Sequence, residues 1–177
     1  LSNLSLLCEL QPVSRADSLA KRFDTMQLSL SVRIVEEFLS KEKASMPLTE
    51  LASLAKRCGY EALCMRASQV GVHSAPEEVD RAVECLADSG LAVSMVTGDF
   101  DTVYNNENGP SALRNISHYL HLAKRLGAPR IRVALKQKSD IEYAKRAADK
   151  AAEQDVQLVH QCHTLSLFET VESIEKT

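Results

Sequence analysis

The sequence predicts an α/β fold in which parallel strands alternate with helices around a barrel. Short strand-like segments and amphipathic helical segments follow one another five times along the 177 residues. The first, second and fourth strands are apolar on one face and polar on the other, and the fifth alternates less cleanly, whereas a strand of an open sheet with helices on both faces is continuously apolar. Units of this kind usually close a barrel of about eight strands. We therefore predict a parallel (β/α) barrel of the TIM type, incomplete, with about five βα units.

The first two units are predicted between residues 28 and 90. Leu28–Ile34 alternates apolar and polar residues, which indicates a strand, and a helix begins at Pro47, whose fixed backbone suits a first helical turn. Gly59 ends that helix. Ala62–Ser68 is the second strand, and the helical pattern after it stops at Gly90, a residue typical of helix ends.

The remaining units repeat this order. Leu91–Thr97 is the third strand, and helical spacing of apolar residues follows over Pro110–Gly127. Arg130–Lys136 is the fourth strand and precedes an alanine-rich helix. Val156–His163 is the fifth, with apolar residues at helical spacing after it. Strands separated by helices in this way are expected to be parallel.

The predicted partial barrel covers residues 26–177, and residues 1–25 form an N-terminal extension outside it.

The composition argues against some classes of function. A formal net charge of -3 argues against nucleic acid as a partner, and no apolar run approaches the length of a membrane span. Five scattered cysteines without a CxxC pair favour a reducing, cytoplasmic location.

The two faces of the strands predict where a site would lie. The apolar residues are assigned outward, under the helices, and the polar residues toward the barrel axis. Active sites of such barrels lie at the carboxyl ends of the strands. The polar series ends there in six side chains: Arg33, Arg66, Arg132, Lys136, Gln161 and His163.

Four of these residues are cations that we predict to bind substrate, namely Arg33, Arg66, Arg132 and Lys136. Guanidinium groups bind carboxylate or phosphate through paired hydrogen bonds and stay charged at working pH. The predicted ligand is therefore a small anionic sugar or acid. The alternative is that each cation pairs with a nearby acid such as Asp99 or Asp101, because charges inside a barrel need partners.

His163 and Gln161 share one predicted face of the fifth strand and are candidates for metal binding. A neutral imidazole also transfers protons near neutral pH, so His163 is a catalytic candidate, whereas Gln161 offers only a carbonyl oxygen. The pair is either a metal site or a hydrogen-bonded structural pair. Asp99, just after the third strand, is the second catalytic candidate, although an aspartate there also suits a turn.

Other histidines and one cysteine are assigned structural positions. Alternation places His160 and Cys162 on the opposite face of the strand from His163, which favours burial of the thiol. His118 and His121 are neighbours on a helix, but no cysteine or acid accompanies them in the sequence, so we expect them on a solvated edge.

Four stretches of the chain resemble the xylose-isomerase-like TIM barrels, the sugar phosphate isomerase/epimerase superfamily. They are GYEALCMRAS, SGLAVSMVTGDFD, LAKRLGAPRIRV and LVHQCHTLSLFET, and the resemblance extends from about Met26 to the end. It implies a divalent metal (Mg, Mn, Co or Zn) at the strand-end rim and proton transfer beside a carbonyl of a sugar, sugar phosphate or hydroxy acid. His163 matches the family's histidine, whereas Gln161 stands where family members commonly have a metal-binding glutamate.

Three functions are compatible with the sequence. The first is an isomerase or epimerase of the kind that the resemblance implies. The second is a non-catalytic protein that binds an anionic sugar or acid through its arginines. The third is a scaffold whose open sheet edges pair with another chain, since five parallel strands cannot close such a barrel. We expect a homo-oligomer or a complementing chain at these edges.

Overall fold

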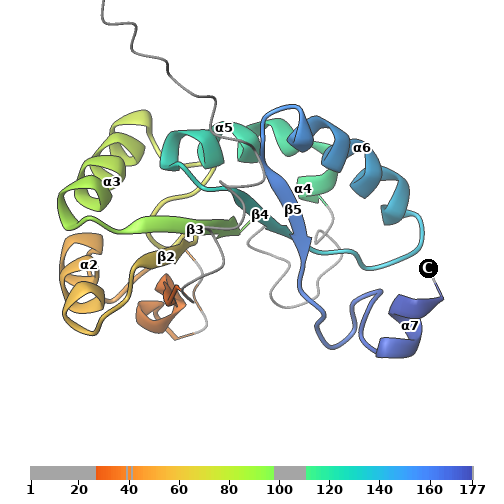
Figure 1. The fold of residues 1–177 in the computed structure, drawn as a ribbon, viewed down its shortest axis with the longest axis horizontal. Coiled ribbons are helices and arrows are strands. Elements are labelled where there is room, and N and C mark those ends of the chain that lie inside the picture. Colours follow the sequence, from red (N-terminus) through yellow and green to blue (C-terminus); the bar gives the residue numbers. More distant parts are fainter. Residues whose placement is uncertain (1–26, 39, 41, 98–110, 177) are drawn as a thin grey trace, which may run out of the picture.

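The computed structural model describes residues 27–38, 40, 42–97 and 111–176. Within them, five parallel strands form one sheet, in which spatial order follows chain order (Figure 1). The strands are β1 Ser29–Ser31, β2 Ala62–Met65, β3 Ala92–Thr97, β4 Arg130–Val133 and β5 Gln157–His160. The prediction of five parallel βα units is confirmed.

The helices between the strands cover one face of the sheet. They are α2 Leu48–Arg57, α3 Pro76–Ser89, α4 Ser111–Arg114, α5 Ile116–Leu126 and α6 Asp140–Ala152. Figure 1 shows them in an arc around the outside of the sheet, as in a segment of a barrel wall. A short helix, α7 Val171–Glu175, lies beyond the carboxyl end of β5. None of the described helices combines the length and apolar character that a membrane span requires.

The core lies between the sheet and this arc. Leu63, Met65 and Ile131 come from the strands, Leu51 and Leu120 from the helices, and none of the five is more than 1% exposed. Their alternation along β2 and β4 confirms that the apolar face is outward, under the helices. Residues on the opposite face of these strands therefore line the concave side of the sheet.

Glycines end two of the helices as the sequence predicts. Gly90 follows α3 with φ 62° and Gly127 follows α5 with φ 66°, both in the left-handed region. Glycine adopts this conformation without the steric cost that a Cβ brings. Each turn redirects the chain into the next strand, so the two glycines help to place β3 and β4.

Four strands end earlier than predicted: β2 ends at Met65 and β4 at Val133, and β1 and β5 also stop early. β1 ends at Ser31, and residues Val32–Val35 form a 3₁₀ helix, η1, instead of continuing the strand to Ile34. The hydroxyl oxygen of Ser31 accepts a hydrogen bond from the Arg33 backbone N–H and so caps that turn. β5 ends at His160, which places Gln161 and His163 in the loop after the strand. The predicted extension, residues 1–25, lies outside the described residues.

Candidate active-site rim

Three polar residues lie at one rim, at the carboxyl ends of β2, β3 and β4. They are Arg66 and Arg132, which the sequence predicts as substrate contacts, and Thr97. Register pairs Thr97 with Arg132 on neighbouring strands, and Arg66 directly follows the last residue of β2. Adjacent residues in register point to the same face of a sheet. Thr97 and Arg132 therefore lie side by side on one face of the sheet. We assign it as the concave face, because the Arg132 side chain reaches across that face to Gln161 beyond β5.

Arg66 is held by an acid that the sequence prediction missed. Its Nε donates to Glu36 Oε1 at 2.5 Å and its Nη2 to Glu36 Oε2 at 3.3 Å, while the Ser68 hydroxyl donates to Oε1 at 3.1 Å. The Arg66 and Glu36 side chains are only 5% and 7% exposed. Arg66 thus forms a buried ion pair with Glu36. Pairing with an acid of the protein was the alternative to substrate binding that the sequence left open.

Glu36 reaches this position because β1 stops early. The 3₁₀ turn of η1 brings the residue after it back over the rim, where a strand continued to Ile34 would carry the chain away. Nothing in the local pattern distinguishes Glu36 from the neighbouring, exposed Glu37. Its partner Arg66 lies 30 residues further along the chain, so the local sequence does not indicate this pairing.

Arg132 has a neutral partner. Its Nη1 donates to Gln161 Oε1 at 2.5 Å, and no ion pair of Arg132 occurs among the described residues. Burial lowers the pKa of the guanidinium, and the positive charge of Arg66 and then that of Arg33 lower it further. The group stays charged at neutral pH, so an incoming anion would relieve this repulsion.

Arg33 and Cys64 complete the concave face near Arg132. Arg33 lies on η1 and is exposed, so its charge is largely solvated. Cys64 is half-buried on β2, two residues before Arg66. Burial raises the pKa of its thiol, although Arg132 and Arg66 act in the opposite direction. The protonated thiol therefore prevails at neutral pH.

Lys136 lies in the loop between β4 and α6, where a buried carboxylate organises the backbone. Asp140 is fully buried, and its Oδ2 accepts hydrogen bonds from the backbone N–H groups of Lys136 at 2.8 Å and Gln137 at 2.9 Å. Desolvation lowers the pKa of the Lys136 ammonium, while the nearby Asp140 raises it. The start of α6 is thus already occupied by a negative group of the protein itself.

His163 is exposed in the loop after β5. Its Nδ1 lies 3.1 Å from the carbonyl oxygen of Thr164, and its backbone N–H donates to the Ser166 hydroxyl. Because a carbonyl can only accept, the contact requires the proton on Nδ1 and leaves the lone pair on Nε2. That tautomer presents a base to solvent. Asp99, the other predicted catalytic residue, lies outside the described residues.

His160 is enclosed on the opposite side of β5. Its ring packs edge-on against Phe168, 5.4 Å between centroids, and both ring nitrogens are buried, with the Val133 backbone as the polar group that acts against the effect of burial on the ring pKa. Burial lowers the pKa of the ring. The neutral form is therefore favoured in the folded protein.

This burial predicts a stability change with pH. An unfolded histidine has a pKa of about 6.5, so as pH falls below that value the unfolded state takes up the proton before the folded state. We expect the free energy of unfolding to decrease between pH 7.5 and 5.5, as measured by urea denaturation. His160→Phe should reduce this decrease, whereas His163→Gln should leave it. An unchanged pH dependence in His160→Phe would contradict the prediction.

The predicted metal pair is not joined by a cluster of metal-binding side chains within the described residues. No group of three or more His, Cys, Asp or Glu residues gathers there closely enough to hold an ion. The Gln161 oxygen is already bonded to the Arg132 guanidinium, whose charge repels a metal cation. His163 has an open ring nitrogen but no acidic neighbour in a hydrogen bond with it. A divalent ion is therefore not supported by Gln161 and His163 alone.

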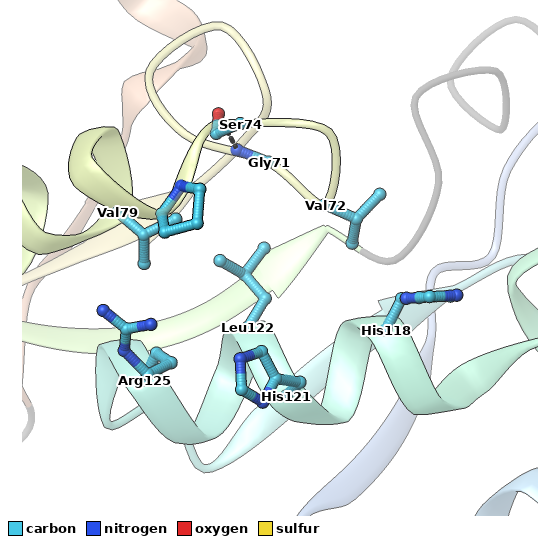
Figure 2. Close-up of a pocket in the computed structure, with 9 residues that line it drawn as sticks. Gly71, Val72, Ser74, Val79, His118, His121, Leu122 and Arg125 are labelled. Atoms are coloured by element: carbon cyan, nitrogen blue, oxygen red, sulfur yellow. Dashed lines mark hydrogen bonds between the residues drawn. The ribbon is translucent and has the colours of Figure 1, made fainter.

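A second hollow lies on the outer surface, away from the rim. It measures about 120 Å³ and separates the loop before α3 from α5. Figure 2 shows Leu122 pointing from α5 toward Val79 and the loop, with His118 and His121 on the same helix. Both histidines are exposed, as predicted from the helical spacing. The hollow shares no residue with the strand-end rim.

Comparisons with known proteins show the fold. No protein-family model matches the sequence, and no curated protein matches it. The probable 3-DHS dehydratase AsbF of Bacillus anthracis, involved in petrobactin synthesis, is a similar structure, with a TM-score of 0.58 and 18% identity over 85% of this chain and 57% of its own. A xylose isomerase-like TIM barrel protein of Mycobacterium smegmatis, in complex with magnesium, has a TM-score of 0.59 and 15% identity over 75% and 53%.

A third similar structure has a different description. The AP endonuclease of family 2 from Brucella melitensis has a TM-score of 0.55 and 16% identity over 85% of this chain and 64% of its own. The predicted likeness to the xylose isomerase-like TIM barrels is thus confirmed at the level of the fold. The chain spans between about half and two thirds of the length of these structures. Their different descriptions show that the fold does not specify one reaction.

Proposed function

We propose that the chain belongs to an isomerase or epimerase that binds a small anionic polyol, a sugar phosphate or a hydroxy acid at the strand-end rim. The observation that carries the proposal is the half-buried Arg132, which has a neutral partner and no carboxylate among the described residues. Such a cation attracts an anionic substrate and fixes its orientation. The fold supports the proposal, because barrels of this type bind substrate at the carboxyl ends of the strands.

The proposed chemistry is proton transfer beside the substrate carbonyl. Arg132 holds the anionic group, and His163 removes a proton from the neighbouring carbon through Nε2, the nitrogen that the Thr164 contact leaves unprotonated. Arg33 adds a solvated positive charge that draws the anion toward the rim. Arg66 acts through Glu36, which keeps it in place, and not as an open ligand. Lys136 is a further proposed contact from the β4–α6 loop, and Asp99 remains the proposed second acid or base.

Proton transfer is tested by exchange with solvent. We expect the chain to catalyse incorporation of deuterium from D₂O at the carbon beside the carbonyl, followed by NMR, in one of a panel of 2-oxo acids, hydroxy ketones and sugar phosphates. His163→Gln should lower the exchange rate by about a hundredfold or more, the range expected for loss of a general base. His118→Gln, on the outer face of α5, is the matched control. Exchange that persists in His163→Gln would contradict the role of this histidine.

The second candidate function is binding of the same anion without catalysis. It is favoured by the Arg132–Gln161 hydrogen bond, which occupies the one oxygen that Gln161 could offer a metal. A metal-assisted enzyme would need Gln161 and His163 together with further donors. Calorimetric titration with Mg²⁺, Mn²⁺, Co²⁺ and Zn²⁺ separates the binding protein from an enzyme whose proton transfer is metal-assisted. Binding that is lost in His163→Ala supports the metal-assisted enzyme, whereas equal heats in both proteins support the binding protein.

We also propose that the open sheet edges associate with a second copy of the chain. In the described part, β1 and β5 each pair with one neighbouring strand only. All strands are parallel, so the β5 edge of one copy matches the β1 edge of another in direction. Exposed apolar side chains lie near both edges, including Phe38, 92% exposed, and Leu165, 71% exposed. Sedimentation should show concentration-dependent dimers or larger species, and a monomer at high concentration would contradict the proposal.

A further inference from the structure

The strand-end rim contains a buried hydroxyl without a partner. Thr97 is only 4% exposed, and its Oγ1 makes no hydrogen bond in the part of the chain that the structure describes. Leaving a buried hydroxyl unpaired is unfavourable, and native proteins rarely do so without a reason. Thr97 is the register partner of Arg132 on the concave face. The residues that carry the orphaned hydroxyl and the guanidinium with a neutral partner are therefore neighbours in the sheet.

The donors left open at this rim are few. Arg66 is engaged by Glu36, and the first backbone N–H groups of the β4–α6 loop are engaged by Asp140. A phosphate usually needs several donors, commonly backbone N–H groups at the start of a helix. Here the carboxylate of Asp140 engages two backbone N–H groups of the loop before α6. Among the described cations of the rim, Arg132 and Lys136 are half-buried and form no ion pair, and Arg132 is the one that lies on a strand next to Thr97.

We propose that Thr97 and Arg132 together form a subsite for the carboxylate group of a sugar acid or hydroxy acid. One carboxylate oxygen accepts from the Arg132 guanidinium, which offers N–H groups besides the Nη1–H bonded to Gln161, and the other accepts from the Thr97 hydroxyl. Two neighbouring donors match the two oxygens of a planar carboxylate. The inference rests on the proposed function and narrows it from anionic polyols in general to carboxylates.

Three six-carbon polyols of similar size test the ligand class. D-gluconate carries a carboxylate, D-glucitol 6-phosphate carries a phosphate, and D-glucitol is neutral. We expect calorimetric titration of the 177-residue chain to show gluconate binding at least about tenfold tighter than glucitol, because a hydrogen bond to a charged group contributes that much or more. Glucitol 6-phosphate should bind more weakly than gluconate.

Two variants of Thr97 separate ligand binding from a structural role. Thr97→Val keeps the shape of the side chain and removes the unpaired hydroxyl, so the variant should be as stable as the native chain or more stable, while gluconate affinity falls about tenfold. Thr97→Ser retains a hydroxyl and should retain most of the affinity. Arg132→Gln should abolish the preference for gluconate over glucitol, whereas Arg130→Gln, on the same strand away from the rim, should not.

The outcomes distinguish this inference from the proposed function. Tighter binding of glucitol 6-phosphate than of gluconate would overturn the carboxylate subsite and leave an anionic substrate in place. Equal gluconate affinity in Thr97→Val and the native chain would overturn the role of Thr97. Gluconate binding that depends on Thr97 and Arg132 supports the subsite even if no substrate shows deuterium exchange, a result that would count against the enzyme and for the binding protein.

Discussion

Replacing Glu36 with alanine should lower the free energy of unfolding by about 3–5 kcal/mol, the largest effect that we expect from a single change at the rim. The substitution removes the partner of Arg66 and leaves a guanidinium that is 5% exposed without a compensating charge. It also removes the acceptor of the Ser68 hydroxyl. Urea denaturation followed by circular dichroism measures the loss.

A matched residue and a double variant test the cause. Glu37 is the next residue and is exposed, so Glu37→Ala should change stability by less than about 0.5 kcal/mol. The double variant Glu36→Gln, Arg66→Met removes both charges and should recover most of the stability, since replacing a buried ion pair as a whole is often nearly neutral. Equal losses in the double variant and in Glu36→Ala would show that the ion pair is not the cause.

Asp140→Ala should lower the free energy of unfolding by about 2–3 kcal/mol. The carboxylate is fully buried and is the acceptor for two backbone N–H groups, those of Lys136 and Gln137. Hydrogen bonds to a charged group contribute about 1.5–3 kcal/mol each, and removal of the unpartnered Oδ1 offsets part of that loss. The same urea denaturation measures the change.

Asparagine is the informative comparison at this position. The amide oxygen of Asp140→Asn can still accept from both backbone groups, so that variant should lose clearly less stability than alanine. Ser139→Ala serves as control, because the Ser139 side chain makes no capping hydrogen bond to α6. If Asn and Ala were equally destabilising, the negative charge itself, and not the acceptor geometry, would be responsible.

Local patterns account for the parts of the fold that the sequence predicts correctly. The two-residue alternation in β2 and β4 identifies which face is buried, because that face is read from neighbouring residues. The helix ends at Gly90 and Gly127 follow from the backbone freedom of glycine at those positions. The strands β1, β2, β4 and β5 all end earlier than the alternation predicts. The length of a strand depends on pairing with its neighbours as well as on its own pattern.

The candidate site divides in a similar way. The sequence placed Arg66 and Arg132 on the concave face because both follow the alternation of their strands. It did not indicate that Arg66 is neutralised by Glu36 or that Arg132 bonds to Gln161, because these pairs lie 30 and 29 residues apart in the chain. Nor did it single out Thr97, whose side chain matters only because its hydroxyl is buried beside Arg132 without a partner.

The amino-acid pattern thus predicts the order of strands and helices, the buried face of β2 and β4 and the set of polar residues at the strand ends. These properties depend on residues close together in the chain. The folded structure was needed to show that, among the described rim cations, Arg66 forms an ion pair and Arg132 bonds to a neutral partner. Charge pairing across the sheet depends on the close approach of distant residues, as when η1 carries Glu36 to Arg66 and leaves Arg132 as the cation with a neutral partner.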